Sequence, residues 1–187
     1  LETVGDMKSM MDSMSVMGKA LLLSIILMYL SLVLLYNNWT DPFVVMFSIP
    51  FSILGAILAL ALSGTSLNIY AMLGLVMLVG LVAKNAILLV DFANEQLAEG
   101  LPIDTALVEA VKMRTRPILM TALSTIIGMI PVAVASGSSA ELRNGIGWVI
   151  IGGMALSTML TLIVVPVVFK VFHRKKKPVT GSVSAIN

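Results

Sequence analysis

Five long apolar runs, separated by polar segments, dominate the chain. Each is near the roughly 20 residues that an α-helix needs to cross the hydrocarbon core of a bilayer. The runs cover residues 18–36, 43–62, 69–92, 117–135 and 147–172. In a soluble protein, polar elements would have to surround these helices, and the chain offers only one short polar helix. We therefore predict an all-α integral membrane fold with five transmembrane helices over residues 18–172.

The segment between the third and fourth runs has a different pattern. Pro102 and Asp104 open it, which is typical of the start of a helix. Apolar residues then recur at spacings of three and four and define one stripe: Ile103, Ala106, Leu107, Ala110 and Val111. We expect an amphipathic helix over residues 102–114 that lies along the cytoplasmic surface of the membrane, either as a plain connector or as a binder of lipid headgroups.

Basic residues are unevenly distributed between the two sides of the membrane that this topology defines. Short connections make neighbouring helices antiparallel, so five spans place the chain ends on opposite sides. Eight Lys or Arg share the side of the long loop and the C-terminal end: Lys112, Arg114, Arg116, Lys170, Arg174, Lys175, Lys176 and Lys177. The positive-inside rule then places the basic tail, residues 173–187, in the cytoplasm, and residues 1–17 at the end of an extracytoplasmic segment. Because the sequence starts without Met or a signal peptide, we expect it to be part of a longer chain.

Composition excludes several other classes of protein. Apolar residues make up 58% of the chain and charged residues 12%, and the mean hydropathy is +1.02. A soluble domain carries about twice that share of charge. The net charge of +2 is too small to indicate a nucleic-acid partner. With no Cys and one His, His173, we predict no metal site, no cofactor and no catalytic centre.

Lys84 is the residue that the membrane prediction explains least easily. It lies near the middle of the third run, where a charged residue costs about 2.5–3.5 kcal/mol on insertion scales. The run extends too far on either side for the side chain to reach water easily. We interpret Lys84, followed by Asn85, as part of an ion-pair or ion-relay site. Asp91, close to the cytoplasmic end of the run, fits a hydrated helix-end charge.

Arg114 and Thr121 are seven residues apart at the start of the fourth run. If one helix continues through Pro117, they share a face, with Arg114 at the cytoplasmic mouth and Thr121 one to two turns deeper. Spacing alone leaves two interpretations open. Arg114 is either a positive-inside anchor or a functional charge, and Thr121 either bonds its own backbone or serves a site.

Small residues and prolines mark the remaining runs. Gly152 and Gly153 lie in the fifth run and predict that helix backbones approach closely there. Pro50, Pro131 and Pro166 are expected to kink their helices or to free backbone carbonyls.

Several strings, in the same order, closely resemble the last helices of resistance-nodulation-division (RND) efflux transporters. They are GLVAKNAILLVDFA at 80–93, RTRPILMT at 114–121, the small residues at 152–153 and 157–158, the Val-Pro at 165–166 and the hairpin residues at 39–42, 50 and 55. The resemblance covers nearly the whole chain. It implies that the five spans are the C-terminal part of a twelve-helix bundle in a bacterial inner membrane.

The resemblance also implies a function and a set of partners. Lys84 and Asn85 match the hydrophobe/amphiphile branch of the family rather than the heavy-metal branch. Lys84, Arg114 and Thr121, and more weakly Asn85, correspond to members of the family's proton relay, whose aspartate pair this sequence lacks. The implied partners are membrane lipid, the remainder of the transporter chain, a homotrimer or related heterotrimer, a periplasmic adaptor and an outer-membrane channel.

We therefore predict a fragment of a proton-motive-force-driven multidrug efflux subunit, and not an enzyme. Two alternatives remain at this point. One is a non-transporting membrane scaffold or remnant, in which the buried polar residues only hold helices together. The other is a relative within the RND superfamily that exports lipids or assists secretion.

Overall fold

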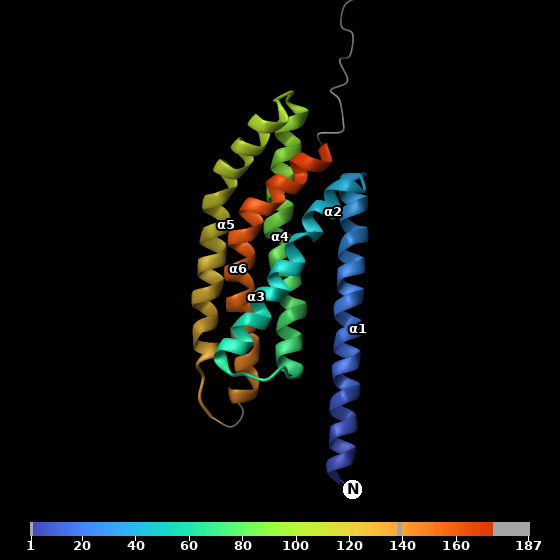
Figure 1. Cartoon of the computed structure of the whole chain (residues 1–187), viewed down its shortest axis with the longest axis vertical. Coiled ribbons are helices and arrows are strands. Elements are labelled where there is room, and N and C mark those ends of the chain that lie inside the picture. Colours follow the sequence, from blue (N-terminus) through green and yellow to red (C-terminus); the bar gives the residue numbers. More distant parts are fainter. Residues whose placement is uncertain (1, 138–139, 174–187) are drawn as a thin grey trace, which may run out of the picture.

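The chain folds into a helical bundle, shown in Figure 1. The structure is a computed structural model that describes residues 2–137 and 140–173. In that part of the chain the helices are α1 (Glu2–Tyr36), α2 (Thr40–Met46), α3 (Ser48–Ser63), α4 (Ile69–Ala98), α5 (Ile103–Ala133) and α6 (Ala140–His173). Among the described residues, five helical stretches are long and apolar enough to cross a membrane: Lys8–Tyr36, Thr40–Ser63, Ile69–Ala98, Ile103–Ala133 and Arg143–His173. The predicted all-α membrane fold with five spans is confirmed.

The second span consists of two helices. α2 ends at Met46 and α3 begins at Ser48, with Phe47 between them. Pro50 explains the position of the break, because a proline has no N–H to donate to the carbonyl of Met46 four residues earlier. The pattern of apolar residues predicted one uninterrupted span over 43–62, since it carries no information on backbone hydrogen bonds.

α5 joins two elements that the sequence pattern had separated. It runs without a break from Ile103 through Pro117 to Ala133, so the amphipathic segment expected over 102–114 and the fourth span are one helix. The apolar stripe packs inside the bundle, because Leu107 and Ala110 belong to the same buried cluster as Phe169 of α6. This packing differs from the expected position along the membrane surface, and it explains the stripe without any contact to lipid headgroups.

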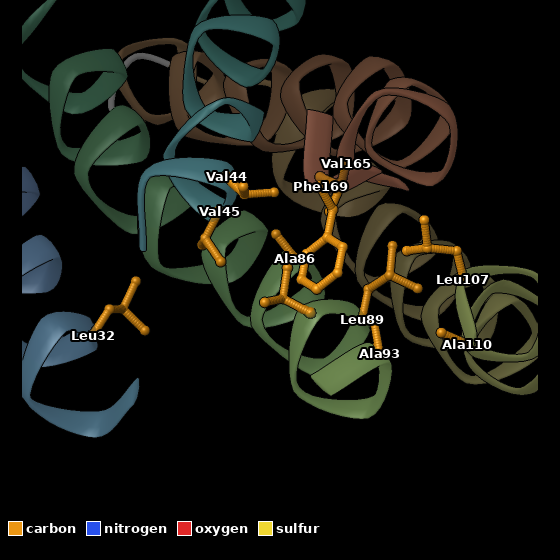
Figure 2. Packing of buried hydrophobic residues seen from close by; sticks show 11 residues of the cluster. Leu32, Val44, Val45, Ala86, Leu89, Ala93, Leu107, Ala110, Val165 and Phe169 are labelled. Carbon is orange, nitrogen blue, oxygen red and sulfur yellow. The ribbon is translucent and has the colours of Figure 1, made fainter. Parts of the chain in front are cut away.

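Two buried clusters hold the bundle together. One surrounds Phe169 near the end of α6, and Figure 2 shows that ring directed toward Ala86 and Leu89 of α4. The other cluster joins α3, α4, α5 and α6 and includes Leu78 and Met154. These clusters fix the neighbours of the central part of α4.

The helix ends fall at two opposite ends of the bundle. The α1–α2 turn, the α4–α5 loop and the end of α6 lie together, and the α3–α4 and α5–α6 connections lie at the other end (Figure 1). α4 and α6 therefore run in the same direction, and α5 runs opposite to both. In the described part of the chain α1 packs on α2 and α4, and among its described side chains only Leu32 is buried.

Candidate functional site

A groove between α4 and α5 brings together most of the residues that the sequence analysis selected. Its volume is about 370 Å³. α4 contributes Lys84 and Asn85, and α5 contributes Thr121. The remaining lining residues are Leu81, Met120, Ser124, Thr125 and Met154. The groove is large enough for several water molecules, each of which occupies about 30 Å³ in the liquid.

Lys84 lies at the midpoint of α4 and opens onto this groove. Its side chain is exposed, and no described carboxylate lies within ion-pair distance of its Nζ atom. Asp91 is seven residues further along α4, which is about 10 Å in a helix, and is itself exposed. Asn85, the neighbour of Lys84, is buried with only 6% of its surface exposed.

Thr121 faces the groove from α5. Its hydroxyl donates to the carbonyl of Ile118 at 3.0 Å, and the hydroxyl of Thr125 donates to the carbonyl of Thr121 at 2.8 Å. A hydroxyl that donates to its own helix still has an acceptor site for a second hydrogen bond. Thr121 is thus both bonded to its own backbone and available to the groove, so the two interpretations left open by its spacing are compatible.

Arg114 is not among the groove-lining residues. It lies two turns before Thr121 on the continuous helix, toward the α4–α5 loop. Its guanidinium carbon is 4.8 Å from the centre of the Phe92 ring, which is a cation–π arrangement. Its Nε atom is buried and has no hydrogen-bond partner among the described residues. The structure thus joins Lys84, Asn85 and Thr121 and sets Arg114 apart from them.

Sequence reasoning missed several of the groove residues. Ser124 and Thr125 follow Thr121 by three and four residues, so the helical spacing rule would have placed them on the same face. Met154 comes from α6, and no local pattern indicates that it reaches a groove between α4 and α5.

A second polar cluster, which sequence reasoning also missed, lies where α2, α4 and α6 meet. The Oδ1 atom of Asp41 is 3.1 Å from Nε2 of His173, and Asn94 donates from Nδ2 to Oδ2 of Asp41 at 2.9 Å. The His173 ring also stacks on Phe169, with ring centres 3.9 Å apart. The side chains of Asp41 and His173 are largely buried, so this cluster connects three helices inside the protein.

A larger cavity carries no comparable chemistry. It has a volume of about 530 Å³ and lies between α1 and the second span. Its lining contains no titratable group: Ile25, Met46, Ile49, Pro50, Ile53, Leu54 and Ile57. The polar groove around Lys84 is therefore the candidate site.

The arrangement around Lys84 can support hydrogen-bond and proton exchange. An ammonium group has three donors, an amide both donates and accepts, and hydroxyls do the same. In a membrane span such groups need partners. The groove collects them from two adjacent helices, α4 and α5, so a relative shift of these helices changes which groups can pair.

Comparison with known proteins identifies the family. The sequence pattern that defines the AcrB/AcrD/AcrF family matches residues 2–173. The chain belongs to this family. The match includes all five candidate spans and confirms the resemblance to RND efflux transporters. The chain is therefore a multi-pass membrane protein.

Individual relatives support the same conclusion. The swarming motility protein SwrC of Bacillus subtilis is 43% identical over 183 residues, which are 96% of this chain and 17% of SwrC. The toluene efflux pump membrane transporter TtgB of Pseudomonas putida is 42% identical over 147 residues, 79% of this chain and 14% of TtgB. The multidrug resistance protein MdtF of Escherichia coli is 42% identical over 160 residues, 83% of this chain and 15% of MdtF. The chain thus spans between 14% and 17% of the length of these relatives.

Proposed function

We propose that the chain is the C-terminal membrane part of a multidrug efflux subunit driven by the proton motive force. In this proposal Lys84, Thr121 and Arg114, with Asn85, carry part of the proton relay of a drug/proton antiporter. The observation that carries it is the convergence of Lys84, Asn85 and Thr121 on one groove between two membrane spans. Membership of an efflux family supplies the transport context.

A charge switch at Lys84 would couple protons to movement. An ionised carboxylate elsewhere in the transporter would pair with the lysine, and protonation of that carboxylate would release it. Losing the pair changes which neighbour the ammonium group can satisfy, and the groove offers Asn85, Thr121, Ser124 and Thr125. A proton is thereby converted into a change of contact between α4 and α5.

Arg114 has a separate role in this proposal. Its guanidinium stacks on Phe92 two turns toward the α4–α5 loop, outside the groove. A fixed positive charge at that position would keep the cytoplasmic end of the pathway electrostatically favourable for anionic groups. We place this loop and the C-terminal end in the cytoplasm of a bacterial cell, and the N-terminal end in the periplasm.

The proposed assembly is a trimer, formed by copies of the parent subunit or with a related one. It would act with a periplasmic adaptor and an outer-membrane channel to move compounds out of the cell. Relay protonation in the membrane would drive conformational change in parts of the transporter outside this chain.

Four single variants of the parent transporter test the relay. We expect Lys84→Ala, Arg114→Ala and Thr121→Ala each to reduce drug export sharply, while membrane insertion and trimer assembly stay intact. Asp91→Asn is the matched control, since Asp91 is exposed and outside the groove, and we expect it to export nearly as well as the parent. Drug accumulation in cells and trimer content on native gels would be measured at equal expression.

The same measurements separate the alternatives. Export at the parental rate by Lys84→Ala would contradict the relay. Loss of export that is accompanied by loss of the trimer would favour a scaffold in which Lys84 only holds helices together.

A further inference from the structure

A buried carboxylate connects three helices at the end of the bundle that holds the α4–α5 loop. The side chain of Asp41, in α2, is 6% exposed, and that of His173, the last described residue of α6, is 13% exposed. Oδ2 of Asp41 accepts hydrogen bonds from Asn94 of α4 at 2.9 Å and from Asn38 at 3.5 Å. Oδ1 is 3.1 Å from Nε2 of His173 and has no other hydrogen-bond partner among the described residues. Oδ1 therefore depends on His173.

Both ring nitrogens of His173 face an acceptor. Nε2 faces the carboxylate of Asp41, and Nδ1 is 3.2 Å from the carbonyl oxygen of Phe169. A carbonyl and an ionised carboxylate can only accept, so both contacts are hydrogen bonds when the ring is a charged imidazolium. The other arrangement that satisfies both puts the proton on Oδ1 of Asp41 and donates it to Nε2. Either arrangement places one proton between Oδ1 and Nε2.

The surroundings of the pair favour a charged ring. His173 stacks on Phe169, with ring centres 3.9 Å apart and an angle of 8° between the planes. A cation over an aromatic face is attracted by the ring. Among the described residues, no lysine or arginine lies within ion-pair distance of Asp41. Because an uncompensated buried charge is strongly destabilising, the proton on His173 supplies the counter-charge that Asp41 needs.

Histidine is the side chain that changes charge between pH 6 and pH 8. Tyr36 of α1 is close enough to Asp41 and Asp91 to interact with both carboxylates, and its hydroxyl donates to the carbonyl of Ile87 at 3.3 Å. α3 contains no titratable residue. Carboxylic acids ordinarily titrate below about pH 5, and tyrosine and lysine near pH 10. The other charged groups at this end of the bundle are Asp91, Glu95, Asp104, Glu109, Lys112, Arg114, Arg116 and Lys170.

We propose that Asp41 and His173 form a proton-dependent clasp, which fastens the end of α6 to α2 and α4. With the proton bound, both contacts of the His173 ring are made. When the proton is released to water, one ring nitrogen presents a lone pair to an acceptor oxygen, and that contact is lost. The clasp is therefore closed at pH 6 and weaker at pH 8.

An apolar contact beside the clasp does not depend on pH. Phe43 of α2 and Phe172 of α6 pack edge to face, with ring centres 5.6 Å apart. Loss of the proton therefore loosens the last turn of α6 and does not detach it from α2. This inference is independent of the proposed relay, because no residue of the groove takes part in the clasp.

Hydrogen exchange of backbone amides in the complete transporter measures how firmly the end of α6 is held. Peptides covering residues 165–173 would be followed at pH 6 and pH 8, with rates corrected for the intrinsic effect of pH on exchange. In the parent we expect protection at pH 8 to be about three- to tenfold lower than at pH 6. That range corresponds to the difference between a charge-assisted and a neutral hydrogen bond. Peptides from α3 serve as an internal control and should show no such step.

Three variants assign the step to the pair. Asp41→Asn removes the carboxylate charge, and His173→Gln replaces the ring by an amide that can donate to Asp41 at either pH. We expect both variants to show the same protection at pH 6 and pH 8. Asp104→Asn is the matched control, because Asp104 pairs with Lys170 of α6 and neither group changes charge in this range. It should keep the step of the parent.

Equal protection of the parent at the two pH values would overturn the clasp. A step that persists in Asp41→Asn or His173→Gln would show that another group binds the proton, and the inference would be wrong. Loss of the step in Asp104→Asn would have the same meaning. If Asp41→Asn lowers protection in α3 as well, the fold is disturbed and His173→Gln alone decides: a lost step supports the clasp and a retained step overturns it.

Discussion

At the scale of single residues, the charged side chains of this membrane chain differ in how deeply their hydrogen bonds and ion pairs are buried. Asp41 is largely buried. Its carboxylate accepts a hydrogen bond from Asn94 and lies within ion-pair distance of His173. Asp104 pairs with Lys170 at 2.5 Å, but both side chains are exposed. Burial decides how much each interaction stabilises the fold, because water competes with the exposed Asp104–Lys170 pair but not with the buried contacts of Asp41.

Asp41→Ala should therefore destabilise the bundle more than Asp104→Ala. The first substitution leaves His173 and Asn94 without their buried acceptor, at a cost of about 1–3 kcal/mol. The second removes an exposed ion pair, typically worth less than about 1 kcal/mol. Thermal unfolding of both variants in detergent would measure the difference. Equal shifts of the melting temperature would show that the Asp41 cluster does not stabilise the fold.

The sequence indicated some of these residues and not others. Lys84 stands out from the apolar pattern by its charge alone, and Thr121 falls on a helical face with Ser124 and Thr125. The Asp41 cluster joins residues from helices that are distant in the chain. Its members look like ordinary helix-end polar residues until tertiary packing brings them together.

At the scale of elements, glycines set how closely the helices approach. The Cβ of any residue placed at Gly152 would lie 2.6 Å from the carbonyl oxygen of Gly55, and a Cβ at Gly55 would lie 2.5 Å from that of Gly152. α3 and α6 thus meet backbone to backbone at this point. The small residues of the fifth run predicted close packing, but only the structure identifies α3 as the partner.

Gly152→Ala should weaken the bundle, because a methyl group at this contact forces α3 and α6 apart. Overpacking of this kind costs about 1–3 kcal/mol. Gly128→Ala in α5 is the control, since nothing lies within 4 Å of the position of its Cβ, and alanine favours helix. We expect a lower melting temperature for the first variant and an unchanged or higher one for the second. A Gly152→Ala protein as stable as the parent would contradict the close α3–α6 contact.

The boundaries of the helices show what the pattern of apolar residues cannot predict. The apolar runs located every span, because each span needs about 20 apolar residues. It separated the start of α5 from the fourth span, since an amphipathic stripe looks the same whether it faces lipid or protein. The partner of that stripe, the Phe169 cluster, is contributed by other helices.

At the scale of the whole molecule, the bundle has two distinct ends (Figure 1). The α4–α5 loop lies at one end and the α3–α4 connection at the other. Exposed residues mark both, Glu99 at the first and Ser66 at the second. The proposed orientation places Glu99 in the cytoplasm and Ser66 in the periplasm.

Thiol labelling tests this orientation directly, since the chain has no native cysteine. In intact cells, a membrane-impermeant reagent should label Ser66→Cys and leave Glu99→Cys unlabelled until the membrane is permeabilised. Labelling of Glu99→Cys in intact cells would reverse the orientation. Labelling of both or of neither would contradict the topology in which the two connections lie on opposite sides.

Proton coupling through Lys84 is the central claim, and drug-driven proton movement tests it most directly. The parent transporter would be reconstituted in vesicles that contain a pH-sensitive dye, and an outward drug gradient imposed. We predict that the parent moves protons against the drug flux and that Lys84→Met, which keeps the bulk of the side chain and removes its charge, moves none. Equal proton movement by both proteins would contradict the account.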